Sequence, residues 1–124
     1  MKKLIPLLLS ALMFTGCAET SNNQANTYRS ITMDEAVTMM ARETGYIILD
    51  VRRPDEFAAG HIPNAINVPN ESIGTDEIPE LPDKDQLIMV YCRSGRRSKE
   101  ASAKLVKLGY TNIVEFGGIL DWKG

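Results

Sequence analysis

Apolar residues in this chain form short runs that alternate with segments of helical spacing. The two longest runs, residues 46–51 and 87–91, are almost continuously apolar, which is typical of strands covered on both faces. The pattern predicts strands at about residues 28–31, 46–51, 65–68, 87–91 and 113–116. Helical spacing and flanking breakers predict helices at residues 33–44, 55–59, 99–108 and about 119–122. This alternation predicts an open α/β fold, a parallel β-sheet with helices on both faces.

Local signals support the ends of these elements. Thr32 is followed three residues later by Glu35, which matches a capping box at the start of the first helix. Gly45 is expected to end that helix, and Pro54 to end the strand that follows. Residues 70–86 are weakly patterned, with at most one helical turn near their start.

The strand at residues 87–91 ends at Cys92, and a short basic loop follows it, Arg93-Ser94-Gly95-Arg96-Arg97-Ser98. In open α/β folds ligands bind beyond the carboxyl ends of the strands, where Cys92 is expected. Backbone N–H groups of such a loop and the N-terminus of the next helix stabilise negative charge, and the arginines add to this. The layout predicts a reactive thiolate. The alternative, a cysteine that only packs in the core, fits poorly with a basic loop directly after it.

Composition and charge narrow the classes of function. The chain is 44% hydrophobic and 24% charged, which is typical of one globular domain, and we expect it to be a monomer. The net charge of −2 argues against nucleic acid as a partner. The arginines after Cys92 must therefore act locally.

The amino terminus is typical of a processing signal. Lys2 and Lys3 precede an apolar stretch at residues 4–14, which is too short for a stable membrane span. The sequence Phe14-Thr15-Gly16-Cys17 then resembles a bacterial lipobox, with Phe14 where the pattern prefers Leu. We predict a signal peptide at residues 1–16, and a lipidated Cys17 with a flexible tether at residues 17–27. The alternative is an ordinary cleaved signal peptide and a soluble secreted protein.

These predictions place the domain, residues 28–124, outside the cytoplasm of a bacterium. Its lipid anchor would hold it to a membrane, on the periplasmic side in a Gram-negative cell. With Cys17 joined to lipid, Cys92 is the only thiol left, so a disulfide framework within the chain is excluded. A single thiol on the oxidising side of a membrane favours a chemical role for Cys92.

Four segments of the domain together resemble the rhodanese, or sulfurtransferase, family. They follow the order of the family's sequence blocks: Leu49 to Phe57, Gly60 to Pro69, Cys92 to Ser98 and Gly117 to Trp122. The resemblance covers nearly everything from Tyr28 onward and implies a rhodanese-like open parallel sheet.

The resemblance also implies a two-step transfer through a persulfide on Cys92. The thiolate takes a sulfane sulfur from a donor such as thiosulfate, and a nucleophile such as cyanide or a thiol removes it. No metal or organic cofactor is needed. Contacts to a small anionic donor are expected from Arg93, Ser94, Gly95, Arg96, Arg97 and Ser98.

Four further residues are expected in the wall of the site or in its support. The resemblance places Asp50 and Arg52 in the wall, and we expect Arg52 to pair with Glu56 and so position the loop. His61 is the only histidine. We expect it to be a hydrogen-bonded structural residue, because an ionised thiolate needs no general base.

Other functions remain open beside sulfur transfer from thiosulfate. A cysteine phosphatase of this fold needs five residues between cysteine and arginine, whereas four separate Cys92 from Arg97 and Ser98 occupies the next position. A non-catalytic binding module is a second alternative, although modules of that kind typically lack the cysteine. A relay that carries persulfide, or that reduces another oxidised sulfur species, would use the same intermediate.

Overall fold

The computed structural model describes residues 27–122 of the chain. Its strands are β2 (Arg29–Ser30), β3 (Ile47–Asp50), β4 (Ile66–Asn67), β5 (Ile88–Cys92) and β6 (Ile113–Gly118). Its helices are α2 (Met33–Arg42), α3 (Pro54–Ala59) and α4 (Arg96–Lys107), with single 3₁₀ turns η1 (Asn70–Ser72) and η2 (Ile119–Asp121). The predicted signal peptide, the lipidation site Cys17 and most of the predicted tether lie outside the described residues.

The strands form one parallel sheet with the order β2-β6-β5-β3-β4. The predicted open α/β fold is thus confirmed. Strand β5 lies in the middle of the sheet, between β3 and β6, and all five of its residues are buried. Because the strands are parallel, the carboxyl ends of β3, β5 and β6 lie at the same edge of the sheet.

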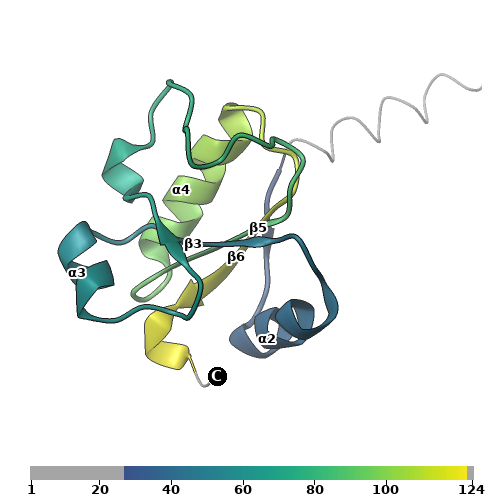
Figure 1. Ribbon diagram of the computed structural model, residues 1–124, viewed down its shortest axis with the longest axis vertical. Coiled ribbons are helices and arrows are strands. Elements are labelled where there is room, and N and C mark those ends of the chain that lie inside the picture. The colour runs from purple at the N-terminus through teal and green to yellow at the C-terminus, as the bar shows by residue number, and fades with distance from the viewer. Residues whose placement is uncertain (1–26, 123–124) are drawn as a thin grey trace, which may run out of the picture.

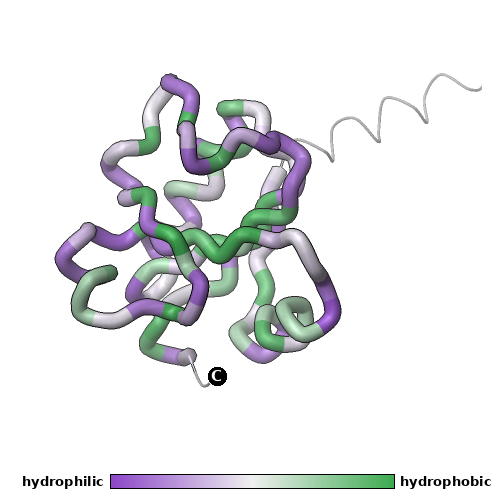
Figure 2. Tube along the Cα trace, in the orientation of Figure 1, coloured by the Kyte–Doolittle hydropathy of each residue, from purple (hydrophilic) through white to green (hydrophobic). Residues whose placement is uncertain are grey.

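Helices cover both faces of the sheet. Alternate residues of each strand point to opposite faces, so the apolar strands present hydrophobic side chains on both sides. Leu49 and Val90 pack on the face under α4, in a cluster with Ala101 and Leu105 of that helix. The opposite face carries a second cluster, in which Ile48, Met89 and Tyr91 pack with Met33 and Ala36 of α2. The ribbon shows α2 and α4 on either side of the central strands (Figure 1), and the trace is most hydrophobic along those strands (Figure 2).

Most predicted element ends hold within one or two residues, although α2 ends at Arg42 with Glu43 as its C-cap, before the predicted Gly45. The capping box is confirmed: the Thr32 hydroxyl accepts from the Glu35 N–H at 3.1 Å, and the Thr32 N–H donates to the Glu35 carboxylate at 2.8 Å. Helix α4, however, begins at Arg96 rather than after Ser98. Strand β6 likewise continues to Gly118, two residues beyond its predicted end. Both differences fall where β6 and the basic loop meet.

Within residues 27–122, no helix has the length and apolar character needed to cross a membrane.

Candidate active site

The loop after β5 wraps its backbone around the sulfur of Cys92. The Gly95 N–H donates to the Cys92 Sγ at 3.0 Å. Gly95 has a φ of 122°, a backbone conformation that favours glycine, and it is the residue from which α4 starts. Because the helix begins at Arg96, its first N–H groups open directly beside the cysteine loop. The structure therefore places one backbone donor of the loop, the Gly95 N–H, on the sulfur, and the start of α4 directly after it.

Cys92 is buried and lines a pocket. The residue itself is 1% exposed, and it lies at the base of a polar pocket of about 310 Å³. The other lining residues are Arg53, Glu71, Arg93, Ser94, Arg96 and Arg97. A buried sulfur under a polar, open pocket can react with a small group that enters it, while it is shielded from larger surfaces.

Gly118 allows the cysteine loop to lie against the end of β6. Cys92 pairs with Gly118 across an irregular step in the β5–β6 register. A Cβ added at Gly118 would lie 1.9 Å from the Arg93 carbonyl oxygen and 2.5 Å from the Ser94 Cα. No side chain fits there, so the glycine is required by the close approach of two backbones.

The arginines of the pocket differ in what holds them. Arg97 donates through both terminal nitrogens to the two carboxylate oxygens of Glu56, at 2.7 and 3.1 Å. Arg96 pairs at 2.8 Å with Glu100, one helical turn along α4. Arg53, which enters the pocket from the loop after β3, pairs with Asp55. Each of these guanidinium groups is offset by a carboxylate.

The pair between Arg97 and Glu56 joins the two loops at this edge of the sheet. Both side chains are largely buried, at 14% and 15% exposure. The hydrogen bonds from Arg97 lower the pKa of Glu56 to about 2, with a further contribution from the Arg53 N–H. The hydrogen bonds to Glu56 in turn raise the pKa of Arg97.

The expected pair between Arg52 and Glu56 is wrong. Arg52 instead binds Asp50 two residues earlier, with its Nη2 at 2.7 Å from the carboxylate, and donates to the Gly60 carbonyl at 2.7 Å. The Arg52 side chain folds back toward the end of β3, because the buried carboxylate of Asp50 requires a cation beside it. Glu56 is thereby left for Arg97, which is 41 residues away in sequence.

Asp50 also joins the two central strands. Tyr91 donates its hydroxyl to Asp50 at 2.6 Å and accepts the Ile62 N–H at 3.1 Å. Burial and the bond to Asp50 raise the pKa of Tyr91. The group of Asp50, Arg52 and Tyr91 is a buried brace beside the site, and it does not line the Cys92 pocket.

Ser98 and the missed residue Glu115 support the loop from behind. The Ser98 hydroxyl is buried and lies 2.7 Å from the Glu115 carboxylate and 2.9 Å from the Gly95 carbonyl. The Ser98 side chain therefore contacts Glu115 and Gly95, and Ser98 does not line the Cys92 pocket. Burial disfavours ionisation of Glu115, yet bonds from Ser98, Ser30 and the Gly117 N–H lower its pKa. The signal available in the sequence was an acidic residue inside an otherwise apolar strand.

His61 is hydrogen bonded, as predicted. Its Nδ1 donates to the Phe57 carbonyl at 3.0 Å, and its ring stacks on that of Phe57 at 3.8 Å between centroids. It closes the end of α3 and does not line the Cys92 pocket.

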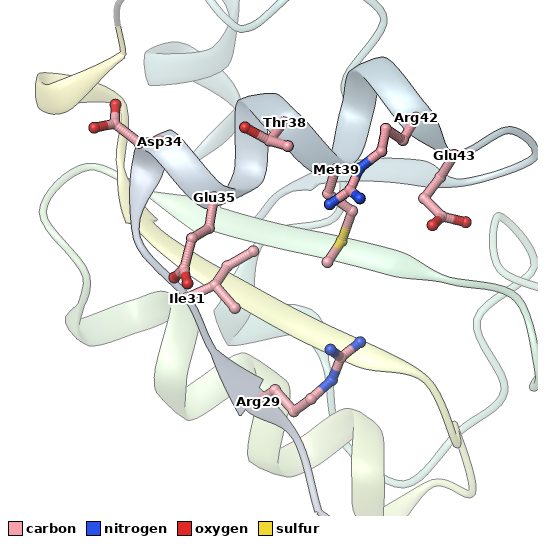
Figure 3. A pocket seen from close by; sticks show the side chains of 8 residues that line it. All are labelled: Arg29, Ile31, Asp34, Glu35, Thr38, Met39, Arg42 and Glu43. Carbon is pink, nitrogen blue, oxygen red and sulfur yellow. The ribbon is translucent and has the colours of Figure 1, made fainter.

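A separate hollow of about 390 Å³ lies between β2 and α2 (Figure 3). Its lining mixes Arg29 and Arg42 with Asp34, Glu35 and Glu43, and no cysteine is among the residues that line it. In the part of the chain that the structure describes, no group of three or more His, Cys, Asp or Glu side chains could hold a metal ion. The Cys92 pocket is therefore the candidate active site.

Comparison with known proteins agrees with this geometry. The family described as "Rhodanese-like domain" matches residues 32–124. The chain belongs to the rhodanese-like domain family. Thiosulfate sulfurtransferase PspE of Escherichia coli is 36% identical over 73 residues, which cover 59% of this chain and 70% of that protein. Thiosulfate sulfurtransferase GlpE of Pseudomonas syringae is 37% identical over 83 residues, which cover 66% and 76%.

Solved structures of rhodanese-like proteins share the fold. The human single-domain sulfurtransferase TSTD1 superposes with a TM-score of 0.62 and 25% identity, over 72% of this chain and 88% of that one. A rhodanese from Escherichia coli, solved with anions, has a TM-score of 0.57 and 34% identity, over 61% and 89%. The sulfurtransferases among these relatives support the same class of activity, a sulfurtransferase, for this rhodanese-like domain.

Proposed function

We propose that this rhodanese moves a sulfane sulfur from a small anionic donor such as thiosulfate to a thiol or cyanide, through a persulfide on Cys92. The observation that carries the proposal is the placement of the Cys92 sulfur. It accepts the Gly95 N–H at 3.0 Å and lies at the base of a pocket lined by four arginines and one carboxylate.

In the first half-reaction the Cys92 thiolate attacks the outer sulfur of thiosulfate. A new S–S bond forms on Cys92, the S–S bond of thiosulfate breaks, and sulfite leaves with the electron pair. The product is a persulfide anion. The Gly95 N–H and the N-terminus of α4, which begins at the next residue, stabilise this negative charge.

In the second half-reaction the acceptor attacks the outer sulfur of the persulfide. With cyanide, a C–S bond forms, the persulfide S–S bond breaks, and thiocyanate leaves while Cys92 returns as the thiolate. A thiol acceptor, attacking as its thiolate, leaves as a persulfide in the same way. Neither half-reaction as written requires a metal or an organic cofactor, so the side chains and backbone of this domain are enough for the proposed transfer.

The arrangement favours sulfur transfer over phosphate hydrolysis. Only four residues separate Cys92 from Arg97, and Arg97 is held by Glu56 in a two-bond pair. A loop of this size is a tight turn, and its N–H donors suit a single terminal sulfur atom. A tetrahedral phosphate needs a wider ring of donors.

Intact-mass measurement of the purified domain after exposure to thiosulfate tests the proposal. We expect the mass to rise by one sulfur atom and to return to its original value when cyanide is added. Cys92→Ala should show no gain, and Ser72→Ala, an exposed change outside the pocket, should show the full gain.

The absence of any adduct with thiosulfate and with other sulfane donors would overturn the proposal. If Cys92→Ser abolished hydrolysis of an aryl phosphate while no sulfur adduct formed, a phosphatase would be the correct assignment. Binding of a protein partner with no chemistry at Cys92 would instead indicate the binding module.

We further propose that the enzyme works as a monomer, without nucleic acid, tethered outside the cytoplasm through a lipid on Cys17. The support is the lipobox-like sequence at residues 14–17, which follows a short apolar stretch. Expression of Cys17→Ser in a bacterial host should release the protein from the membrane fraction. Unchanged membrane association would contradict lipidation at Cys17.

A further inference from the structure

The arginines that surround the Cys92 pocket are not equally free to bind a ligand. Arg97 is paired with Glu56, Arg96 with Glu100, and Arg53 with Asp55. Among residues 27–122, no ion pair and no side-chain hydrogen bond engages the guanidinium of Arg93. An arginine whose charge is not offset attracts an anion more strongly than one that already holds a carboxylate.

The backbone of Arg93 is nevertheless fixed beside the sulfur. Arg93 directly follows Cys92, and its carbonyl oxygen packs against Gly118 and accepts the Leu120 N–H at 3.4 Å. Its side chain lines the pocket and is exposed. Arg93 therefore combines a backbone that is fixed beside the sulfur with a guanidinium charge that no carboxylate of the described residues offsets.

Glu71 places a negative charge in the lining of the same pocket. It is exposed and lines the pocket, and its charge reaches Arg97. Its position is also held, because the neighbouring Asn70 is buried and bound to α4. The Asn70 side chain donates to Glu100 at 2.9 Å, and Lys104 donates to the Asn70 carbonyl at 3.0 Å.

We propose that Arg93 is the residue that selects anionic substrates in both half-reactions, and that Glu71 limits this selection. The proposal rests on the proposed sulfur transfer and adds the class of acceptor to it. A small thiol that carries a carboxylate is expected to remove sulfur faster than a neutral or cationic thiol of the same size. Because Cys92 is 1% exposed, the acceptor must be small or must present its thiol on a thin chain.

Donor charge gives the first test. Thiosulfate is a dianion, and methanethiosulfonate is a monoanionic sulfane donor in which a methyl group replaces one oxygen. Arg93→Gln should lower kcat/KM for thiosulfate about 10-fold to 100-fold and for methanethiosulfonate clearly less, since a charge-assisted hydrogen bond is lost. Glu71→Gln should raise kcat/KM for thiosulfate about 3-fold.

Matched variants remove the same charges away from the pocket. Arg42→Gln changes an exposed arginine at the end of α2, and Glu80→Gln an exposed glutamate outside the lining. Both should leave the ratio of the two donors unchanged. If Arg42→Gln lowered use of thiosulfate as much as Arg93→Gln does, the net charge of the domain rather than Arg93 would select the donor.

Acceptor charge gives the second test. The persulfide form is mixed with 3-mercaptopropionate, 2-mercaptoethanol or cysteamine, three thiols in which two methylenes join the sulfur to a negative, a neutral or a positive group. Each measured rate is divided by the thiolate concentration of that thiol. We expect the order 3-mercaptopropionate, 2-mercaptoethanol, cysteamine, and Arg93→Gln should remove most of the difference. Equal rates, or the reverse order, in the unmodified protein would overturn the proposal.

A binding measurement separates this proposal from sulfur transfer itself. In the Cys92→Ala background, which cannot react, thiosulfate binding is measured by calorimetry with and without Arg93→Gln. About 10-fold weaker binding supports Arg93 even if no persulfide ever forms on the native protein. Equal binding of the two variants overturns the role of Arg93, even if Cys92 is confirmed as the sulfur carrier.

Discussion

The loops after β3 and β5 belong to the same kind of unit, a buried parallel strand followed by a short loop and a helix. Both begin at the same edge of the sheet, and each carries an arginine within two residues of the end of its strand. In the β3 loop, Arg52 is buried and turns back onto Asp50 and the Gly60 carbonyl. In the β5 loop, Arg93 is exposed at the mouth of a pocket whose base is a sulfur.

The same structural unit therefore forms a closed polar network in the β3 loop and leaves arginines beside a pocket in the β5 loop. The β3 loop satisfies its own polar groups, because a buried carboxylate at the strand end requires the nearest cation. The β5 loop ends its strand with a thiol, which takes only the Gly95 N–H from the loop. Its arginines therefore remain at the pocket, and the bond between Arg97 and Glu56 fixes one loop against the other.

Removing Asp50 should produce the largest loss of stability. Asp50→Ala leaves Arg52 buried without its carboxylate and Tyr91 without its acceptor, so we expect the free energy of unfolding to fall by about 3–5 kcal/mol. Urea denaturation measures this change. Asp55→Ala, which removes an exposed acid in α3, is the control and should leave the midpoint essentially unchanged. Similar losses in the two variants would show that the β3 loop is no brace.

A side chain at Gly118 should affect the β5 loop instead. In Gly118→Ala the new Cβ would overlap the Arg93 carbonyl, so we expect a loss of about 2 kcal/mol in stability. Displacing the loop by about 1 Å should also reduce sulfur transfer roughly 100-fold. Gly74→Ala is the control, because its Cβ would meet nothing within 4 Å. Full activity of Gly118→Ala would mean that the loop position beside β6 does not matter for the chemistry.

The bond between the two loops should give the smallest effect and a dependence on pH. The pKa of Glu56 is about 2 in the fold against an ordinary value of 4.5, so its stabilisation is present above about pH 4.5 and disappears as the pH falls toward 2. Glu56→Gln should lower the free energy of unfolding at pH 7 by about 1 kcal/mol. Unfolding midpoints of both proteins, measured from pH 7 down to pH 2, should converge at the acidic end. A constant difference across this range would contradict the pair as its source.

Much of the fold could be predicted because its signals are local. Continuous apolar runs marked β3 and β5 as doubly covered strands, and the capping box marked the start of α2. Cys92 and Gly95 could also be identified, since a thiol at the end of a buried strand and a glycine in a tight loop are visible in a few residues. The start of α4 was misplaced by three residues, because Arg96 and Arg97 resemble loop residues when their partners are unknown.

The sequence alone determined the order of the elements, the parallel sheet, the cysteine at the end of β5 and the basic character of its loop. Only the tertiary structure decided which carboxylate each arginine meets: Asp50 for Arg52, Glu56 for Arg97, and no partner for Arg93 within the described residues. The physical reason is that ion pairs depend on the distance between side chains in space. Residues 41 positions apart meet across two loops, while Glu56, four positions from Arg52, does not pair with it.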